Sequence, residues 1–329
     1  MNQRLAYVDM MRGIAILLVV AAHLIQTNVN GGAYTKAFMF INSFHMPLFF
    51  AISGYIAQKV YMPLEGAKDL LFFIKKKAIA LLIPLFVWDL IVYKLFLSST
   101  WEWPTYDSFI HEINHPRLWF LLTLFLIFVG YSIFSFTGKK WNAGRKIYKD
   151  IVLLSLILIL YCFYYVANLR VVQVALYSIP FYMGVFIAKY KNLEKFVLNE
   201  YILATSFVVF VLLVGHWDMW SGSYKDDIIK NIIDPCAFVV LLNGCMKMEK
   251  WKMSHAICQW GRYSLEIYVA HWTMLNIFGS GFDVADINQI WLFLLAAVVS
   301  LPITYACIGF SKIIEISRLT RLLMYGRTK

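Results

Sequence analysis

Long apolar runs alternate with short polar segments along the whole chain. A helix needs about 20 apolar residues to cross the hydrocarbon core of a bilayer, and windows of about that length recur throughout the sequence. Proline interrupts some runs, which membrane helices tolerate because neighbouring groups satisfy the freed backbone atoms. The pattern predicts an all-α, polytopic integral membrane protein with about ten transmembrane helices. The predicted spans are 11–28, 39–59, 79–97, 118–136, 150–167, 171–188, 201–217, 229–245, 263–278 and 288–311.

The composition agrees with a membrane protein and excludes an ordinary soluble domain. Of the 329 residues, 61% are hydrophobic and only 15% are charged, whereas soluble domains carry roughly 25% charged residues. The five Cys residues show no C-x-x-C pair and no metal-ligand spacing, so we interpret them as packing residues and expect no metal site. Residues 1–329 show no internal repeat and no segment with the composition of a second, soluble domain. They are expected to form a single transmembrane domain without a fused extracytoplasmic domain.

The positive charges fall mainly on one side of the predicted spans. If both termini are cytoplasmic, 23 Lys and Arg residues lie in inner segments, which agrees with the positive-inside rule. The net charge of +11 then reflects loops that face anionic lipid, so we expect a bilayer and no nucleic acid as partner. The sequence predicts a multi-pass protein of the inner (plasma) membrane. Five basic residues fall on the outer side: Lys36, Arg117, Arg170, Lys225 and Lys230.

Ionisable residues inside the spans are the candidates for chemistry. Each costs roughly 2.5–3.5 kcal/mol at the centre of a bilayer, and such residues usually face the interior of the bundle. Arg12 and His23 end the stretch "RGIAILLVVAAH" in the first span. Eleven residues are close to three helical turns, so both side chains project from nearly the same face, about 16 Å apart along the axis. His45 lies near the outer end of the second span, and the ninth span carries Glu266 and His271.

Each of these residues also has a structural interpretation. Arg12 can extend its side chain toward cytoplasmic phosphates, and His45 can be a hydrogen-bonded residue at the interface. Glu266 can pair with Arg262 one helical turn earlier. His23 is the strongest functional candidate, because the ten residues before it have no polar side chain.

Four motifs occur in order along the chain: Arg-x10-His, "FHMPLFFAISGY", "LWFLLTLF" and "GRYSLEIYVAH". Together they resemble the membrane-bound acyltransferase family 3, and "FHMPLFF" is most similar to its fucose-4-O-acetylase-like branch. The resemblance extends from Tyr7 to about Ser311. It implies ten core helices and transfer of acyl groups from acyl-CoA to hydroxyls of sugars and other surface molecules. It also implies that His23 is catalytic and that Arg12 is its partner in the motif.

The resemblance also implies a binding site for the phosphates of CoA. Many members carry Arg-x-x-Arg before the third span, and here the corresponding stretch follows a polar connection predicted over 60–78. Lys75, Lys76 and Lys77 are present, but Ala80 stands where a second basic residue is expected. Lys binds phosphate as a point charge, without the planar fork of Arg. We therefore expect these lysines to bind the donor.

An O-acyltransferase is the function that these observations favour. A neutral His suits removal of a hydroxyl proton, since its reference pKa is near 6.5. Arg12 and the three lysines would hold cytoplasmic acyl-CoA, while the pantetheine arm reaches toward His23. Acetyl-CoA is the expected donor, because acetyl is the acyl group that the family resemblance implies. His45 would orient His23 or bind the acceptor, which is a sugar or a cell-surface glycan. Further acceptor contacts are expected from Asn42, Ser43, Arg117, Trp119, Glu266 and His271.

A transporter or permease for a small polar or glycan-linked substrate is the main alternative. Polar groups at mid-membrane depth and broken helices also serve permeation. Against this alternative, the two halves of the chain show no inverted repeat. A sensor or structural membrane protein is a third possibility, but it does not require a His and an Arg on one helix face. The sequence does not indicate the oligomeric state.

The orientation can be tested by cysteine labelling. In a variant without native Cys, Lys146→Cys should not react with a membrane-impermeant thiol reagent added to intact cells, because the predicted topology places it in the cytoplasm. Lys36→Cys, which is predicted to lie outside, should react under the same conditions. Labelling of position 146 from the outside would contradict the topology.

Overall fold

The structure is a computed structural model of the chain, and it is helical in the part that it describes. The described residues form no β-sheet, and their β-type pairing is limited to one isolated bridge between Val29 and Phe282. The chain divides into two compact units. The described residues are 5–89, 117–137, 146–167, 173–221, 223–276, 281–283 and 287–328.

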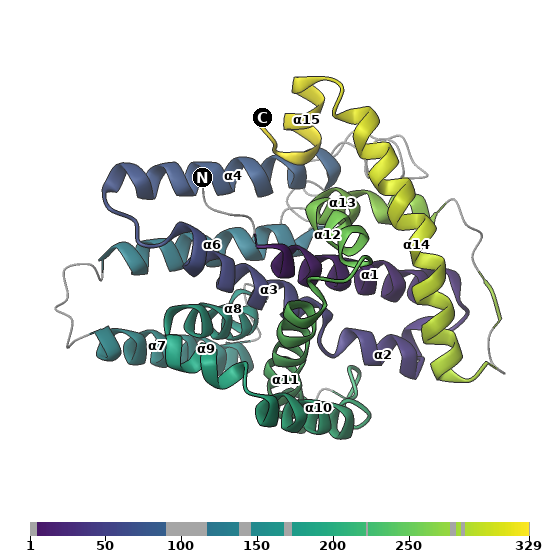
Figure 1. Ribbon diagram of the computed structural model, residues 1–329, viewed down its shortest axis with the longest axis horizontal. Coiled ribbons are helices and arrows are strands. Elements are labelled where there is room, and N and C mark those ends of the chain that lie inside the picture. Colours follow the sequence, from purple (N-terminus) through teal and green to yellow (C-terminus); the bar gives the residue numbers. More distant parts are fainter. Residues whose placement is uncertain are drawn as a thin grey trace. The chain divides into compact units, whose positions relative to one another are not determined.

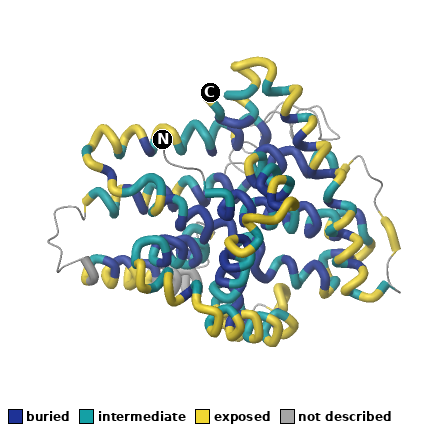
Figure 2. The backbone as a smooth tube through the Cα atoms, viewed as in Figure 1, coloured by how far each residue is buried: buried dark blue, intermediate teal, exposed yellow. Residues whose placement is uncertain are grey.

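The first unit consists of Met1–Ile56 and Met183–Ile313. Its elements are α1 (Ala6–Asn28), η1 (Gly32–Tyr34), α2 (Lys36–Asn42), α3 (His45–Ile56), α9 (Lys191–Val197), α10 (Glu200–Val214), α11 (Tyr224–Met248), α12 (Ser254–Arg262), α13 (Ser264–Leu275) and α14 (Gln289–Ile314) (Figure 1). Helix α1 contacts α2, α3, α11, α12 and α13, and most of its residues are buried (Figure 2). It is therefore the central helix of this unit.

The second unit consists of Ala57–Tyr182 and Ile314–Lys329. In it, α4 packs on α6 and on α15. Gly326 ends α15 at a φ of 60°, and a Cβ there would lie 2.2 Å from the carbonyl oxygen of Ile79 in α4. Only glycine permits this close approach. The elements are the π-helical turn η2 (Ala57–Tyr61), α4 (Ala67–Phe86), α6 (Trp119–Thr137), α7 (Lys146–Ala167) and α15 (Arg318–Tyr325), and the boundary between the units falls inside α8 (Gln173–Lys189).

Two glycines bring the backbones of α1 and α12 into direct contact. A Cβ on Gly13 would lie 2.1 Å from the carbonyl oxygen of Ile257, and a Cβ on Gly261 would lie 1.8 Å from that of Asp9. Small residues allow such close packing in membrane helices, where dispersion contacts and not apolar burial drive helix association. The position of α12, and of α13 directly after it, is thereby set against α1.

The helices agree with the predicted all-α class. Each of the ten predicted spans overlaps a helix, although residues 90–97, 171–172 and 277–278 of these spans lie outside the described residues. Ten spans and cytoplasmic termini therefore stay predictions. In the described part of the chain, the segments long and apolar enough to cross a membrane are Ala6–Asn28, Lys36–Tyr61, Trp119–Thr137, Tyr224–Met248 and Gln289–Ile314, with the bent pair Lys191–Val197 and Glu200–Val214 as a possible sixth.

The second half of the predicted polar connection 60–78 is helical, because α4 already begins at Ala67. The side chain of Asp69 accepts hydrogen bonds from the backbone N–H groups of Glu65 and Gly66, both at 3.1 Å. This acidic cap provides acceptors for backbone N–H groups at the start of the helix. Lys is itself a good helix former. The basic stretch 75–77 consequently lies on a helix and not in a loop.

The contact between α1 and α12 can be tested by stability. Gly13→Ala should destabilise the protein by roughly 1–3 kcal/mol, since the added methyl group overlaps backbone atoms that cannot move aside. Gly244→Ala is the matched control, because a Cβ at this helical glycine meets no atom within 4 Å. Thermal unfolding in detergent should show a lower Tm for Gly13→Ala and an unchanged or higher Tm for Gly244→Ala. Equal Tm values would contradict the close packing.

Candidate active site

Two imidazole rings from different helices lie against each other in the first unit. His23 is on α1 and His271 is on α13, and their ring centroids are 5.1 Å apart at an interplanar angle of 32°. The ring of Trp272 contacts His23 edge-on, with centroids 5.3 Å apart. His271 is buried, whereas His23 is half-buried. A substrate can therefore reach His23 while His271 supports it from the interior.

The hydrogen bonds indicate which ring nitrogen of each histidine carries a proton. The Nδ1 of His271 lies 2.7 Å from the carbonyl oxygen of Tyr268, and it must donate because a carbonyl only accepts. The Nε2 of the neutral ring then holds a lone pair. In the same way, Nδ1 of His23 lies 2.9 Å from Oε1 of Gln26, which leaves the lone pair of His23 on Nε2. Both histidines thus keep an unprotonated nitrogen.

The Nε2 atom of His271 is buried and has no hydrogen-bond partner among the described residues. Buried polar atoms are nearly always hydrogen-bonded, so an exception needs an explanation. A ligand hydroxyl that donates to this nitrogen would provide the missing bond. The atom is therefore a candidate contact for a substrate.

A third histidine, His45, lies on another helix of the same unit. It begins α3, is buried, and donates from Nδ1 to the carbonyl oxygen of Ile41 over 2.9 Å. The ring contact joins His23 and His271, and His45 adds a buried imidazole on α3, a helix that also contacts α1. We refer to these three residues as the histidine cluster.

Asn42 is the last residue of α2, and Ser43 begins the short turn that leads to His45. The side-chain amide of Asn42 donates to the carbonyl oxygen of Phe38 over 3.0 Å, and the hydroxyl of Ser43 donates to that of Phe40 over 2.8 Å. These bonds are local and hold the turn that breaks the helix. Ser43 is fully buried, so its first role in this structure is to shape the chain before His45.

Lys230 on α11 is a charged neighbour of the cluster. Its Nζ lies 3.5 Å from the carbonyl oxygen of Asn42 and 4.8 Å from the centroid of the Trp217 ring, and it interacts electrostatically with His45. One turn further on, Asp234 is buried and interacts with Lys230. By sequence, Lys230 counts only as a charge on the outer side. The spacing of opposite charges at i and i+4 inside an apolar span was the signal that could have revealed the pair.

A second polar group lies toward the N-terminal end of α1. Asp9 is buried and forms an ion pair with Arg262, with 3.6 Å between Oδ2 and Nε. Arg12 is half-buried one turn later on the same helix, and Glu266 on α13 is fully buried. Ionisable residues therefore lie at two levels along α1: near Arg12, and near His23.

The three predicted donor lysines belong to the second unit and differ from one another. The Nζ of Lys77 lies 4.0 Å from the ring centroid of Phe128 and 4.5 Å from that of Tyr61, which are favourable cation–π distances. Lys75 and Lys76 are exposed on α4, although Nζ of Lys76 also lies 5.5 Å from the centroid of the Tyr61 ring. Lys77 has the closest aromatic contacts, and the other two side chains are accessible.

Arg117 and Trp119 also lie in the second unit, at the start of α6. Arg117 is exposed. The ring of Trp119 packs on that of Tyr177, with centroids 5.1 Å apart and an interplanar angle of 33°. A packing role for this tryptophan accounts for its position.

The arrangement in the first unit suits removal of a proton from a hydroxyl group. It presents an accessible lone pair on His23 and a second, buried lone pair on His271, with a cation, Lys230, close to His45. Within the described ranges, no group of three or more His, Cys, Asp or Glu residues is placed to hold a metal ion.

Comparison with known families identifies the class of protein. The sequence profile of the acyltransferase-domain family, acyltransferase family 3, matches residues 5–309. The chain therefore belongs to this family, whose members are embedded in membranes. The matched region contains every residue of the histidine cluster.

Two curated proteins are similar to part of the chain. The nodulation protein NolL of Sinorhizobium fredii is 28% identical over 148 residues, which is 42% of this chain and 39% of that protein. NolL of Mesorhizobium japonicum is 26% identical over 135 residues, which is 39% of this chain and 35% of the relative. The aligned part thus spans less than half of each relative. No solved structure matches the chain significantly.

Proposed function

We propose that the protein is an integral-membrane O-acyltransferase. It transfers an acyl group, acetyl in this proposal, from cytoplasmic acyl-CoA to a hydroxyl of a sugar or cell-surface glycan. The observation that carries the proposal is the half-buried His23, whose free lone pair lies beside His271 in a chain of the acyltransferase family. The protein would act as one domain in the inner (plasma) membrane, with both termini in the cytoplasm.

His23 acts as the general base in this reaction. Its Nε2 takes the proton of the acceptor hydroxyl while the hydroxyl oxygen attacks the carbonyl carbon of the thioester. The C–S bond then breaks, and the proton passes from His23 to the leaving thiolate of CoA. Gln26 keeps the ring in the tautomer that this step needs, because it accepts the hydrogen bond from Nδ1.

His271 and His45 position the acceptor and the base. Nε2 of His271 accepts a hydrogen bond from a second hydroxyl of the acceptor, which satisfies this buried atom. His45 on α3 is held by its hydrogen bond to Ile41, and in this proposal it helps to orient His23. Orientation of both reactants is a large part of catalysis, since it replaces a bimolecular encounter with a step between bound groups.

Cationic side chains hold the donor at the cytoplasmic side. Arg12 lies about 16 Å along α1 from His23, which leaves room for an extended pantetheine arm between the phosphates and the base. Lys75 and Lys76 are exposed and available to bind phosphate. In this proposal Arg12 serves the donor and His23 serves the acceptor, at different depths along α1.

Two substitutions of His23 test the catalytic assignment. His23→Ala and His23→Gln should both lower kcat by roughly 10²–10⁴-fold, since loss of a general base costs about this much and an amide cannot take up a proton at neutral pH. Both variants should insert normally and keep the KM for acetyl-CoA. Arg12→Lys should stay partly active, because it keeps the charge and loses only the planar fork.

A structural role for His23 predicts a different pattern. His23→Gln would then turn over at nearly the normal rate, because the amide still forms hydrogen bonds, while His23→Ala would be unstable in detergent. Measuring kcat and thermal stability for both variants side by side separates the two roles. A normal kcat in His23→Gln rules out the base.

The donor site is tested on α4. Changing Lys75 and Lys76 together to Gln should raise the KM for acetyl-CoA by roughly tenfold and leave that for the acceptor unchanged, since a charged hydrogen bond contributes about 1.5–3 kcal/mol. Lys68→Gln is the matched control, an exposed lysine near the start of the same helix. Lys77 is left intact because its aromatic contacts support the fold. An unchanged donor KM in a correctly inserted double variant would limit these lysines to a role in topology.

A further inference from the structure

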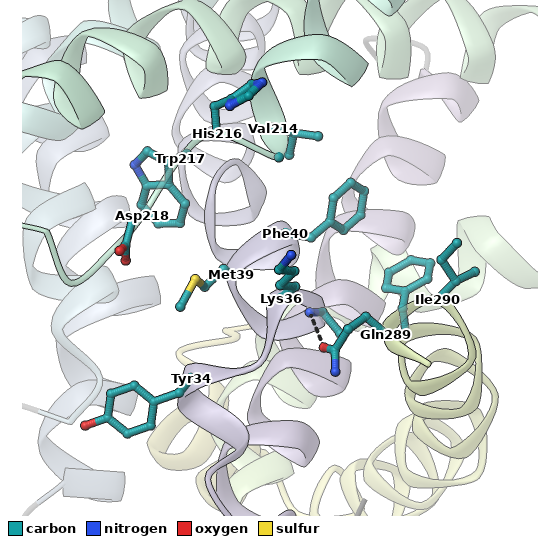
Figure 3. Close-up of a pocket in the computed structure, with 13 residues that line it drawn as sticks. Tyr34, Lys36, Met39, Phe40, Val214, His216, Trp217, Asp218, Gln289 and Ile290 are labelled. Atoms are coloured by element: carbon teal, nitrogen blue, oxygen red, sulfur yellow. Dashed lines mark hydrogen bonds between the residues drawn. The ribbon is translucent and has the colours of Figure 1, made fainter. Parts of the chain in front are cut away.

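A cavity of about 570 Å³ lies in the first unit, apart from the histidine cluster. Its walls come from the segments 34–40, 214–218 and 289–293 (Figure 3). Each segment adjoins a connection that the charge distribution assigns to the outer side of the membrane. The volume falls within the roughly 300–1,000 Å³ that is typical of small-molecule sites.

Aromatic rings contribute to the walls of the cavity. Tyr34 and Phe40 line it from the segment 34–40, and Trp217 lines it from the segment 214–218 (Figure 3). Tyr34 is 70% exposed, and its ring packs against that of Trp220 with centroids 5.3 Å apart. An exposed aromatic ring held in place by a neighbour offers a flat apolar surface to a ligand, at little further cost in side-chain entropy.

Polar groups of both charges interrupt this apolar lining. Lys36, Asp218 and Gln289 all contribute to the cavity (Figure 3). The Oε1 atom of Gln289 accepts from the backbone N–H of Ala37 over 3.1 Å, which aligns its amide and leaves the NH₂ group as a donor. A cation, a carboxylate and an amide donor together suit a neutral ligand with several hydroxyl groups. They suit an anion less well, because Asp218 would repel it.

One side chain lies between the wall of the cavity and the turn that precedes His45. Trp217 lines the cavity, and its ring lies 4.8 Å from Nζ of Lys230. The same Nζ lies 3.5 Å from the carbonyl oxygen of Asn42, three residues before His45. Lys230 therefore contacts both the cavity wall and the segment that leads into α3.

From this geometry we infer that the cavity is the outer docking site where the acceptor binds before its hydroxyl reaches His23 and His271, and that the acceptor presents a neutral sugar ring there. The C–H face of the ring packs on the aromatic walls, and its hydroxyls bond to Lys36, Asp218 and Gln289. The inference rests on the proposed acyltransferase function, and it adds the place where the acceptor binds and the chemistry that recognises it. Entry from the outer side would bring the acceptor to His23 from the end opposite to the donor.

Filling the cavity tests this inference directly. Gly215 lines the cavity, and a Cβ there meets no atom within 4 Å, so the Cβ of Gly215→Phe fits and its ring adds bulk beside the cavity. Gly244→Phe is the matched control, because a Cβ at this glycine also meets no atom within 4 Å and the residue lies outside the cavity. Binding is measured by saturation-transfer NMR on the full chain in nanodiscs. The probes are methyl α-L-fucoside, methyl β-D-glucoside and methyl N-acetyl-β-D-glucosaminide, with inorganic phosphate as the anionic comparison.

At least one glycoside should bind to the unmodified protein. Gly215→Phe should raise its Kd by roughly tenfold or more, whereas Gly244→Phe should change it by less than about twofold. If Gly215→Phe does not fold, Lys36→Gln and Lys225→Gln decide the question, since both remove an outer positive charge and only Lys36 lines the cavity.

Three results would overturn the inference: binding of no glycoside, binding of phosphate alone, or equal glycoside binding in the cavity variant and its control. Failure of the acyltransferase proposal has a separate signature. In that case the unmodified protein would transfer no acetyl group from acetyl-CoA, while glycoside binding at the cavity persisted.

Discussion

The direct backbone contact between α1 and α12 is the constraint on which the site depends. Gly13 and Gly261 have no side chains to separate the two helices, and Asp9 reaches Arg262 across the same interface. Because α13 follows α12 after a single residue, the contact also fixes where α13 lies along α1. His271 meets His23 for this reason. A bulkier residue in the interface would move the two rings apart without altering either histidine.

The same helix separates two kinds of chemistry by depth. Arg12 lies near its beginning, and His23 lies three turns later, where the ring of His271 on α13 packs against it. In the proposed reaction the charged donor is cytoplasmic and the hydroxyl acceptor is outside. One continuous helix with a cation at one level and a base at another can serve both without a moving part. The outer cavity extends this arrangement to the acceptor.

Local features of the site could be predicted from the sequence, because they follow from periodicity and composition. Apolar runs of bilayer length predicted helices, and the helices are present. The spacing of eleven residues placed Arg12 and His23 on one face of one helix. Both inferences use a single helix and its solvent, so they need no knowledge of packing.

Contacts between helices could not be predicted in the same way. The approach of His271 to His23 depends on two glycines that have no chemical signature of their own. Lys230 was counted as an outer charge, since composition does not show that its side chain lies beside Asn42 and Trp217. The lysines at 75–77 were assigned to a polar connection from their charge alone, which does not show that they lie on a helix. The Asp69 side chain caps the start of that helix, and Lys77 packs against aromatic rings.

The central claim is that this chain moves an acyl group between substrates on opposite sides of a membrane. Proteoliposomes with the purified protein in one orientation test it, with radiolabelled acetyl-CoA on the side of Lys75 and Lys76 and a methyl glycoside that binds the cavity on the other side. The account predicts ester-linked label on the glycoside and release of one free CoA for each ester formed. Passage of unmodified glycoside through the membrane, with acetyl-CoA left intact, would contradict it and favour a transporter.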